Sequence, residues 1–316
     1  MHLAVAVAAV AALAIGVSAH PDPYRDKLNR PTVHDNLDYL KLGMNQWLPE
    51  TTYTLSEWNN GYMPEECKNI VTGKADGGGT QYNPNDFQIF DVHYDDCGEP
   101  WQFCHHRSSN SSIDTVARLF GKLPIQMRQW IRHVIDVPSQ QGHAFEWNGS
   151  VIFFAADNSI TVFAHETAHS LDLNGAYADH ALSYSDRWWN EYDQDWQVPD
   201  PYSNSNGIED VAQCTVVSVF DVNVPGGFPS VEPNWGGIEH QIHLIQAEAR
   251  DAGEGNSILI PGHNKECTHR MPHSNPVPMN GNSKRGPAPD VRMRSNVTLI
   301  DTSKRVEKHS GCTLTW

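Results

Sequence analysis

Apolar and polar residues follow two different spacings near the middle of the chain. Residues 149–156, GSVIFFAA, form a short apolar run dominated by Val, Ile and Phe, which is typical of a β-strand. The polar residues DNS then suit a turn and a helix cap, and apolar residues recur three or four positions apart from Ile160 to Leu171. This pattern predicts a strand that leads into a helix with one buried face.

Three further segments have helical periodicity. Between Ile113 and Val137 the apolar residues recur mostly three or four positions apart, which predicts a helix interrupted near Pro124. A second pattern covers residues 208–219, and a third covers residues 238–250 after the sequence PNWGG. The centre of the chain is therefore predicted to be largely helical.

The outer parts of the chain carry weaker signals. Residues 20–110 are rich in Pro, Gly, Asn and Asp and predict few long elements, residues 172–205 are a polar, Trp-rich connection, and residues 253–316 form an irregular tail. No repeat or sharp change of composition marks a second domain, and roughly 300 residues suffice for one large core. We expect a single α+β domain with its core in residues 111–252.

The first nineteen residues are predicted to be a secretory signal peptide. A nearly unbroken apolar stretch ends in Val17, Ser18 and Ala19, small residues placed as a signal peptidase requires, so His20 would be the first mature residue. No later segment approaches the roughly 18 continuous apolar residues of a membrane span. We therefore expect a soluble protein that is secreted to the extracellular space.

Cysteine content and charge agree with export. Six cysteines allow up to three disulfides whose pairing the sequence leaves open, and no CxxC pair points to a thiolate metal site. Three Asn-x-Ser/Thr sequences are candidate glycosylation sites in a secreted protein. The net charge of −16 argues against binding nucleic acid or anionic lipid, which requires clustered Lys and Arg. The cysteines are Cys67, Cys97, Cys104, Cys214, Cys267 and Cys312, and the glycosylation candidates are Asn110, Asn148 and Asn296.

The helix predicted from Ile160 contains the sequence His165-Glu166-Thr167-Ala168-His169. Four residues of an α-helix turn through about 400°, so the two histidines project from nearly one face and can share one Zn²⁺. Glu166 lies beside that line and could deprotonate a zinc-bound water without itself being a ligand. A chance match in a chain with 17 histidines is the alternative, but the apolar back face and the preceding strand favour a zinc site.

A catalytic zinc site needs a third protein ligand and an open position for water. A third His six residues after His169, as in metzincins, is excluded because Gly175 stands there. Glu191, in NEYDQD, follows the Asn-Glu-x-x-x-Asp pattern of thermolysin-like enzymes, whereas Glu209 opens the second helical segment. Asp210, next to Glu209, is a further alternative, and of the three we favour Glu209.

The residues around Glu209 resemble those of one branch of the gluzincins. In anthrax lethal factor and related secreted enzymes, the third ligand is a Glu followed by two residues, then Ala and an acid or amide, with a Tyr seven residues before it. Here Glu209 is followed by Asp-Val-Ala-Gln, and Tyr202 stands at that offset. The form His-Glu-x-x-His-x-x-Asp, from His165 to Asp172, is also similar to that group. The resemblance covers about 55 residues, 162–216.

This resemblance implies a zincin-like fold and a role for each matched residue. His165, His169 and Glu209 would bind one Zn²⁺ per chain, and Glu166 would activate water. Tyr202 would donate a hydrogen bond to the developing oxyanion or the leaving amine. The signal peptide, the acidic charge and the Trp-rich connection are also similar to secreted proteins of filamentous fungi, including the conidiation-specific proteins.

Other side chains have a metal-binding interpretation of their own. Asp172, one turn beyond His169, could orient an imidazole. An N-terminal His20 would be half of a copper site like that of lytic polysaccharide monooxygenases, although an ordinary signal junction is the simpler interpretation. An acidic cluster could hold Ca²⁺ but lacks the EF-hand pattern. That cluster is Asp86, Asp91, Asp95 and Asp96, and the remaining histidine pairs are His105 with His106 and His240 with His243.

Together these features predict a secreted zinc metallopeptidase that hydrolyses peptide bonds. Its fold would be α+β, zincin-like and disulfide-bonded, with the strand 151–154 beside the cleft. Its partner would be a peptide or protein substrate, with no nucleic acid or membrane, and we expect a monomer. The alternative is a zincin scaffold with a structural or binding role and no turnover; Glu166 and Tyr202 favour the enzyme, because a binding protein has no need of them.

Overall fold

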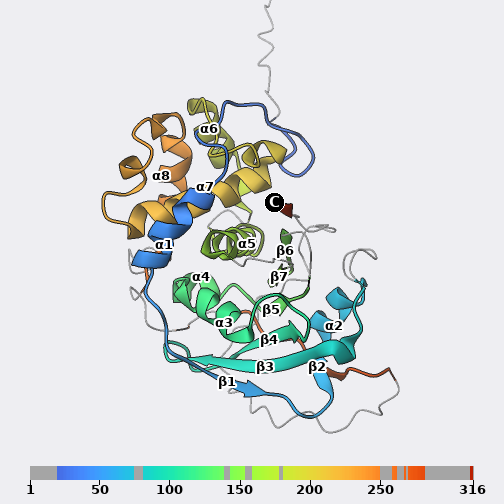
Figure 1. The fold of residues 1–316 in the computed structure, drawn as a ribbon. Coiled ribbons are helices and arrows are strands. Elements are labelled where there is room, and N and C mark those ends of the chain that lie inside the picture. Colours follow the sequence, from blue (N-terminus) through green and yellow to red (C-terminus); the bar gives the residue numbers. More distant parts are fainter. Residues whose placement is uncertain are drawn as a thin grey trace, which may run out of the picture.

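A mixed β-sheet crosses the molecule, with most helices gathered on one face (Figure 1). The computed structural model describes residues 20–74, 81–138, 143–153, 159–177, 181–249, 258–261, 267 and 270–281, together with the backbone of 314–315. The strands are β1 Tyr53–Glu57, β2 Tyr62–Pro64, β3 Phe87–Tyr94, β4 Trp101–His106, β5 His133–Asp136, β6 His143–Trp147, β7 Ser150–Phe153, β8 Pro276–Pro278 and β9 Leu314–Thr315. The helices are α1 Lys41–Trp47, α2 Glu65–Val71, α3 Ile113–Lys122, α4 Ile125–Arg128, α5 Ile160–Leu173, α6 Asp186–Gln194, α7 Gly207–Asn223 and α8 Glu239–Glu248.

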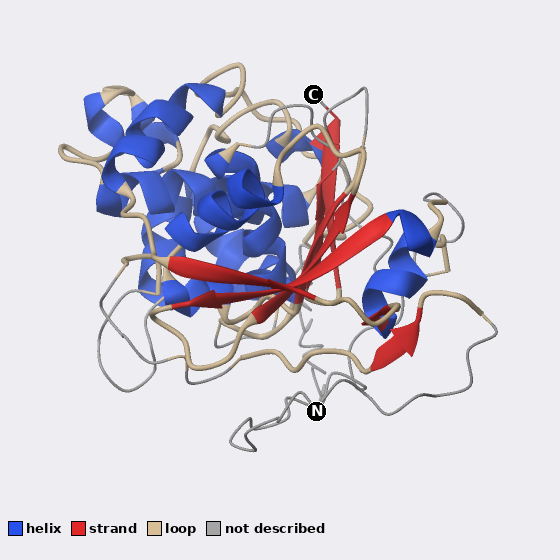
Figure 2. Ribbon diagram, turned by 60° about the horizontal axis from the view of Figure 1, so that its bottom comes forward, coloured by secondary structure: helices blue, strands red, loops and turns tan. Residues whose placement is uncertain are grey.

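The main sheet has seven strands in the order β1-β3-β4-β5-β7-β6-β9. The pairs β1 with β3 and β3 with β4 are antiparallel, whereas β4, β5 and β7 run parallel. β6 is antiparallel both to β7 and to the short β9. Figure 2 shows this twisted sheet with the larger group of helices on one side and α2 on the other. β2 and β8 form a separate two-stranded sheet.

The two faces of the sheet carry separate hydrophobic clusters. Successive side chains of a strand point to opposite faces, so Val151 and Phe153 of β7 join the larger cluster and Ile152 joins the smaller one. Phe153 stacks on Phe163 of α5 with ring centroids 4.0 Å apart. The smaller cluster contains Ile70 and other residues of α2. The helix α5 is therefore held against the sheet by the larger core, with α7 packed on it.

Most of the patterns in the centre of the chain become the predicted elements. The apolar run 149–156 forms β7 over Ser150–Phe153, and residues 154–158 lie outside the described residues. The helix predicted from Ile160 to Leu171 is α5, which extends to Leu173. The segments 208–219 and 238–250 correspond to α7 and α8, with residue 250 outside the description. These elements are mixed α and β, as expected.

Two predictions about secondary structure are wrong. The helix expected between Ile113 and Val137 is interrupted at Pro124, between α3 and α4, as predicted, but its last part is the buried strand β5. The sequence His-Val-Ile-Asp is compatible with a helix or a strand. It forms a strand here because it pairs with β4 and β7. The region 20–110 was expected to have few long elements, yet it supplies β3, with eight residues, and β4 to the main sheet.

Two disulfides link distant parts of the fold. Cys67 of α2 is bonded to Cys104 of β4, and Cys97 is bonded to Cys267 across 170 residues of sequence. The second bridge ties the C-terminal region to the turn between β3 and β4. Cys214 of α7 is buried and unpaired, and Cys312 lies outside the described residues. Of the three disulfides that the sequence allows, these two are formed.

The predicted signal peptide, residues 1–19, lies outside the described residues, so secretion stays a prediction. In the part of the chain that the structure describes, no helix is both long enough and apolar enough to cross a membrane. Residues as far apart as Leu28 and Leu259 share the larger hydrophobic cluster. The N-terminal region is thus packed into the same core as the central helices.

Candidate metal centre

Two helices bring the candidate ligands together. α5 carries His165 and His169 one turn apart, and α7 packs directly against it with Glu209 in its first turn. α7 begins at Gly207 because the side chain of Asn206 accepts a hydrogen bond from the Glu209 backbone N–H at 3.0 Å, which satisfies one free donor of the helix end. This cap fixes where Glu209 stands relative to α5.

Three potential ligand atoms converge between α5 and α7. The Nε2 atoms of His165 and His169 are 2.9 Å apart, and Oε2 of Glu209 lies 3.1 Å from the first and 3.3 Å from the second. Ligand atoms about 2.0 to 2.1 Å from a tetrahedral Zn²⁺ are about 3.3 to 3.4 Å from one another. Among the described residues, these three alone form a group of His, Cys, Asp or Glu side chains that could hold a metal ion.

The three ligand atoms need a proton or a metal ion between them. Nδ1 of His165 lies 3.0 Å from Oε1 of Gln213, an acceptor, so Nδ1 carries the ring proton and Nε2 presents a lone pair. That lone pair faces both Nε2 of His169 and the carboxylate oxygen of Glu209, which also offers lone pairs. Either a proton on His169 or a metal ion can satisfy all three atoms.

The electrostatics of the group reflect its close contacts. Burial lowers the pKa of His169, but the Glu209 carboxylate outweighs this, so the pKa lies above its ordinary value. Burial together with the neighbouring His169 lowers the pKa of His165. Although burial acts to raise the pKa of Glu209, the two imidazoles outweigh it and hold that pKa well below its ordinary value. Glu209 is therefore ionised, as a metal ligand must be.

Glu166 lies next to His165 and is completely buried, with 0% of its surface exposed. Among the described residues, neither of its carboxylate oxygens has a hydrogen-bond partner. Burial raises its pKa well above the ordinary value, and the negative charges of Glu209 and of Glu146 on β6 raise it further. This carboxylate has a high affinity for a proton and two oxygens available to another group.

The structure separates the alternative acids from the candidate site. Glu191 lies on α6, where its carboxylate accepts a hydrogen bond from Gln194. Asp210 follows Glu209 on α7, but its Oδ1 lies 4.0 Å from Sγ of Cys214, one turn further along the helix. Only Glu209 joins the two histidines of the motif.

Tyr202 lies beside the group, as its offset from Glu209 predicts. It directly precedes the short 3₁₀ helix Ser203–Ser205, and its ring centroid is 5.7 Å from that of His165. The loop before α7 therefore places Tyr202 beside His165, the same residue that Glu209 of α7 contacts.

Asp172 accepts no hydrogen bond from either imidazole of the motif, so it does not have the predicted orienting role. Oδ1 of Asp172 accepts a hydrogen bond from the Ser183 backbone N–H at 3.0 Å, and Nδ1 of His169 has no hydrogen-bond partner in the described part of the chain. Asp172 therefore orders the loop after α5. The residue that does bond an imidazole is Gln213, to which the sequence analysis gave no role; its position four residues after Glu209 was the available signal.

The Asp172→Asn variant is expected to stabilise the metal-free protein at neutral pH. Burial raises the pKa of Asp172 to about 6, so as the pH rises from about 4 to 6 the unfolded chain ionises first and the wild type loses stability. Asparagine keeps an acceptor for Ser183 and does not ionise. One pKa unit corresponds to about 1.4 kcal/mol, which gives a gain of about 2 to 3 kcal/mol at pH 8 and little at pH 4.

Urea unfolding at both pH values measures this effect. The exposed Asp35→Asn variant is the control and should match the wild type throughout. An Asp172→Asn variant with the same gain at pH 4 and pH 8 would show that ionisation of Asp172 is not the cause.

The other candidate metal ligands have different partners. Nε2 of His20 lies 3.6 Å from Oδ1 of Asp186, and its ring stacks on Trp189. Nδ1 of His240 is bonded to Asp195 at 2.8 Å, and Nδ1 of His105 to Asp136 at 2.9 Å. These histidines hold elements of the fold together.

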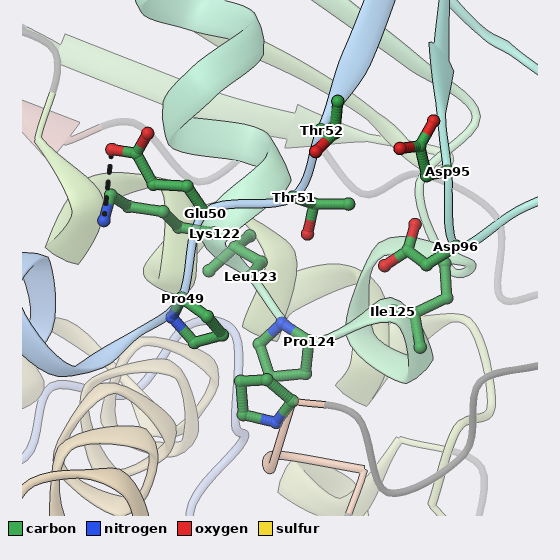
Figure 3. Close-up of a pocket in the computed structure, with 11 residues that line it drawn as sticks. Pro49, Glu50, Thr51, Thr52, Asp95, Asp96, Lys122, Leu123, Pro124 and Ile125 are labelled. Carbon is green, nitrogen blue, oxygen red and sulfur yellow. Dashed lines mark ion pairs between the residues drawn. The ribbon is translucent and has the colours of Figure 1, made fainter.

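Two residues of the acidic cluster, Asp95 and Asp96, line a pocket of about 400 Å³ that none of the motif residues lines. Asp95 and Asp96 lie on one side of it, and Glu50 and Lys122 form an ion pair on the other, at 3.6 Å (Figure 3). Asp96 is paired with the buried Arg128. Arg128 therefore already neutralises the charge of Asp96. The four carboxylates of the cluster do not converge on one position, as the ligands of a calcium site must.

The fold and the site define this protein as an α+β domain with a buried His-His-Glu group between two packed helices. The chain belongs to the Con-13 family, described as conidiation-specific protein Con-13, whose family model matches residues 33–245. The matched region includes α5 and α7 and therefore the whole candidate metal centre.

A curated relative agrees with this assignment. The chain is 32% identical over 182 residues to conidiation-specific protein 13 of Neurospora crassa, and the match covers 57% of this chain. It covers 52% of the relative, so the chain spans about half the length of that protein. No solved structure matches.

These comparisons confirm the predicted similarity to fungal conidiation-specific proteins and give no support to the gluzincin resemblance. Neither description names a catalytic activity or a metal. The α+β class is observed, whereas the zincin-like fold has no solved structure to support it. The side chains of the site are therefore the basis for inferring what this protein does.

Proposed function

We propose that this protein is a secreted zinc-dependent peptidase whose metal is held by His165, His169 and Glu209. The observation that carries the proposal is the convergence of their three ligand atoms at 2.9 to 3.3 Å. The spacing is close to that of three corners of a zinc coordination tetrahedron, and the three side chains come from two helices that are separate in sequence.

The chemistry of the donor set suits zinc. Two imidazole nitrogens and one carboxylate oxygen are borderline ligands, and three protein ligands leave a coordination position open, as in catalytic rather than structural zinc sites. One Zn²⁺ per chain would supply a Lewis acid that lowers the pKa of water to about 7.

The remaining residues have complementary roles in peptide hydrolysis. Glu166, which follows His165 on α5, accepts the proton of the attacking water, because among the described residues neither of its carboxylate oxygens is held by another hydrogen bond. The protonated Glu166 can then pass that proton to the leaving amine. Tyr202, beside His165, donates a hydrogen bond to the oxyanion or to the leaving group.

A secreted location and a peptide or protein substrate complete the proposal. The two disulfides are the kind of cross-link that persists in oxidising compartments, and the apolar N-terminal segment supplies the export signal. We expect the mature protein to act as a monomer.

Removal of the metal is expected to abolish hydrolysis. Protein secreted by a fungal host and purified without chelator should contain about one zinc ion per chain by elemental mass spectrometry. Dialysis against a chelator should remove both the zinc and the cleavage of a broad peptide library, and stoichiometric Zn²⁺ should restore both. Cleavage that is unchanged after complete removal of zinc would reject the proposed mechanism.

A second function, a secreted zinc-stabilised scaffold without turnover, is favoured by one observation. The side chains of the site are almost inaccessible: His165, Glu166, His169 and Glu209 expose 1%, 0%, 1% and 2% of their surface. A peptide reaches them only after a neighbouring segment moves. Zinc-loaded protein that cleaves no member of the library, but that unfolds at a higher temperature than the metal-free form, would support the scaffold.

A further inference from the structure

We propose that Gln213 and Asp200 are positioning residues that hold His165 with its Nε2 lone pair facing the metal. The inference depends on the proposed zinc site and adds to it a relay of hydrogen bonds, His165 to Gln213 to Asp200, that fixes one ligand before the metal binds.

Gln213 is placed by the same helix as Glu209. It follows Glu209 by four residues on α7, so both side chains lie on the face that packs against α5. Its side chain is buried, with 5% of the residue exposed, and Oε1 lies 3.0 Å from Nδ1 of His165. One helix face thus presents both a candidate ligand and the partner of another ligand.

Asp200 determines which way the Gln213 amide points. Nε2 of Gln213 donates to Oδ2 of Asp200 at 2.7 Å, and an ionised carboxylate can only accept. The amide nitrogen must therefore face Asp200, which leaves the amide oxygen to face His165. Without Asp200, the amide could rotate by half a turn and offer an N–H group to the imidazole instead.

The orientation of the amide fixes the tautomer of His165. Because Gln213 Oε1 accepts, Nδ1 of His165 donates, and its Nε2 is left unprotonated and directed at Glu209 and His169. Among the described residues, Nδ1 of His169 has no such partner. The two histidines of the motif are therefore unequal, because a hydrogen bond within the fold fixes the tautomer of His165 only.

Asp200 is itself held by the loop that carries Tyr202. Its Oδ1 accepts from the Ser203 backbone N–H at 3.1 Å and from the Ser203 hydroxyl at 3.4 Å. Asp200 is buried, with 2% exposed. The relay thus joins the loop before α7 to a ligand on α5, and it sets Tyr202 and His165 in a fixed relation.

The tautomer can be measured in the metal-free protein by NMR of ¹⁵N-labelled histidine rings. The His165 signals are identified by their loss in His165→Gln. We expect a protonated Nδ1 and an unprotonated Nε2 in the wild type, and a loss of this preference in Gln213→Leu and in Asp200→Asn. Gln213→Glu, which keeps an acceptor for Nδ1, should retain the wild-type tautomer.

Metal affinity provides the second measurement, by competition between each protein and a zinc chelator. Loss of a hydrogen bond to a ligating histidine weakens metal binding by about 10- to 100-fold, and we expect this for Gln213→Leu and Asp200→Asn. The matched control is Gln241→Leu, which removes another buried Gln, one whose side chain donates a hydrogen bond to Asp195 and contacts none of the three candidate ligands. It should bind zinc like the wild type.

Thermal unfolding of each metal-free variant shows whether the variant still folds, so that loss of the relay can be told apart from loss of the fold. If Gln213→Leu does not fold, Asp200→Asn tests the relay instead. A protonated Nε2 in the wild type, or unchanged zinc affinity in both relay variants, would overturn the proposal. A wild-type protein that binds no zinc rejects the proposed function instead, while the tautomer still decides whether the relay exists.

Discussion

Glu166→Gln is expected to keep the zinc and to lower kcat/KM for peptide hydrolysis by about 10³-fold. A general base contributes about 10² to 10⁴ in rate, and glutamine cannot accept the proton of water. The substitution should not damage the fold, because glutamine has the shape of glutamate and places no charge in this fully buried position. Zinc content and initial rates of peptide cleavage, measured on the same preparation, test this expectation.

Glu191→Gln is the matched control for this prediction. It makes the same chemical change on α6, where Glu191 contacts Gln194 and none of the three candidate ligands. It should retain wild-type rates. A Glu166→Gln protein that cleaves peptides as fast as the wild type removes Glu166 from the mechanism, even if zinc is present.

Glu209→Ala is expected to reduce the metal content from about one zinc ion per chain to nearly none. The variant leaves two imidazoles from α5 as the only protein ligands, and it also removes the carboxylate that raises the pKa of His169. Elemental mass spectrometry of secreted protein that was purified without chelator measures the zinc content directly. Hydrolysis should be lost together with the metal.

Glu191→Ala and Asp210→Asn distinguish Glu209 from the other acids. Both variants should keep about one zinc ion, since the structure places neither side chain in the group of ligand atoms. Zinc that is lost with Glu191 and kept without Glu209 would show that the third ligand has been assigned to the wrong helix. Zinc that is absent from the wild type would leave the three side chains as a buried hydrogen-bonded group.

Asp172 and Gln213 show why positions near a motif need the structure to be interpreted. From the sequence, Asp172 is one helical turn beyond His169 and well placed to orient it. In the fold, the Asp172 carboxylate instead accepts a hydrogen bond from the Ser183 backbone N–H. Gln213 is 48 residues from His165 in sequence and becomes its partner because α7 packs on α5.

The sequence by itself determined the local features of this protein. The helical spacing of apolar residues located α5 and α7, and the spacing of the motif put His165 and His169 on one face of α5, because an α-helix has a fixed rotation per residue. The run of Val, Ile and Phe located β7. These properties depend on neighbouring residues only.

Only the tertiary structure decided the long-range features. It made His133–Asp136 a strand, since a short apolar segment takes the structure of the strands beside it. It brought Glu209, and not Glu191, to the histidines, and it buried Glu166 among other acids, which raised its pKa. Each of these outcomes depends on which surfaces pack together, and packing joins residues whose separation in sequence carries no local signal.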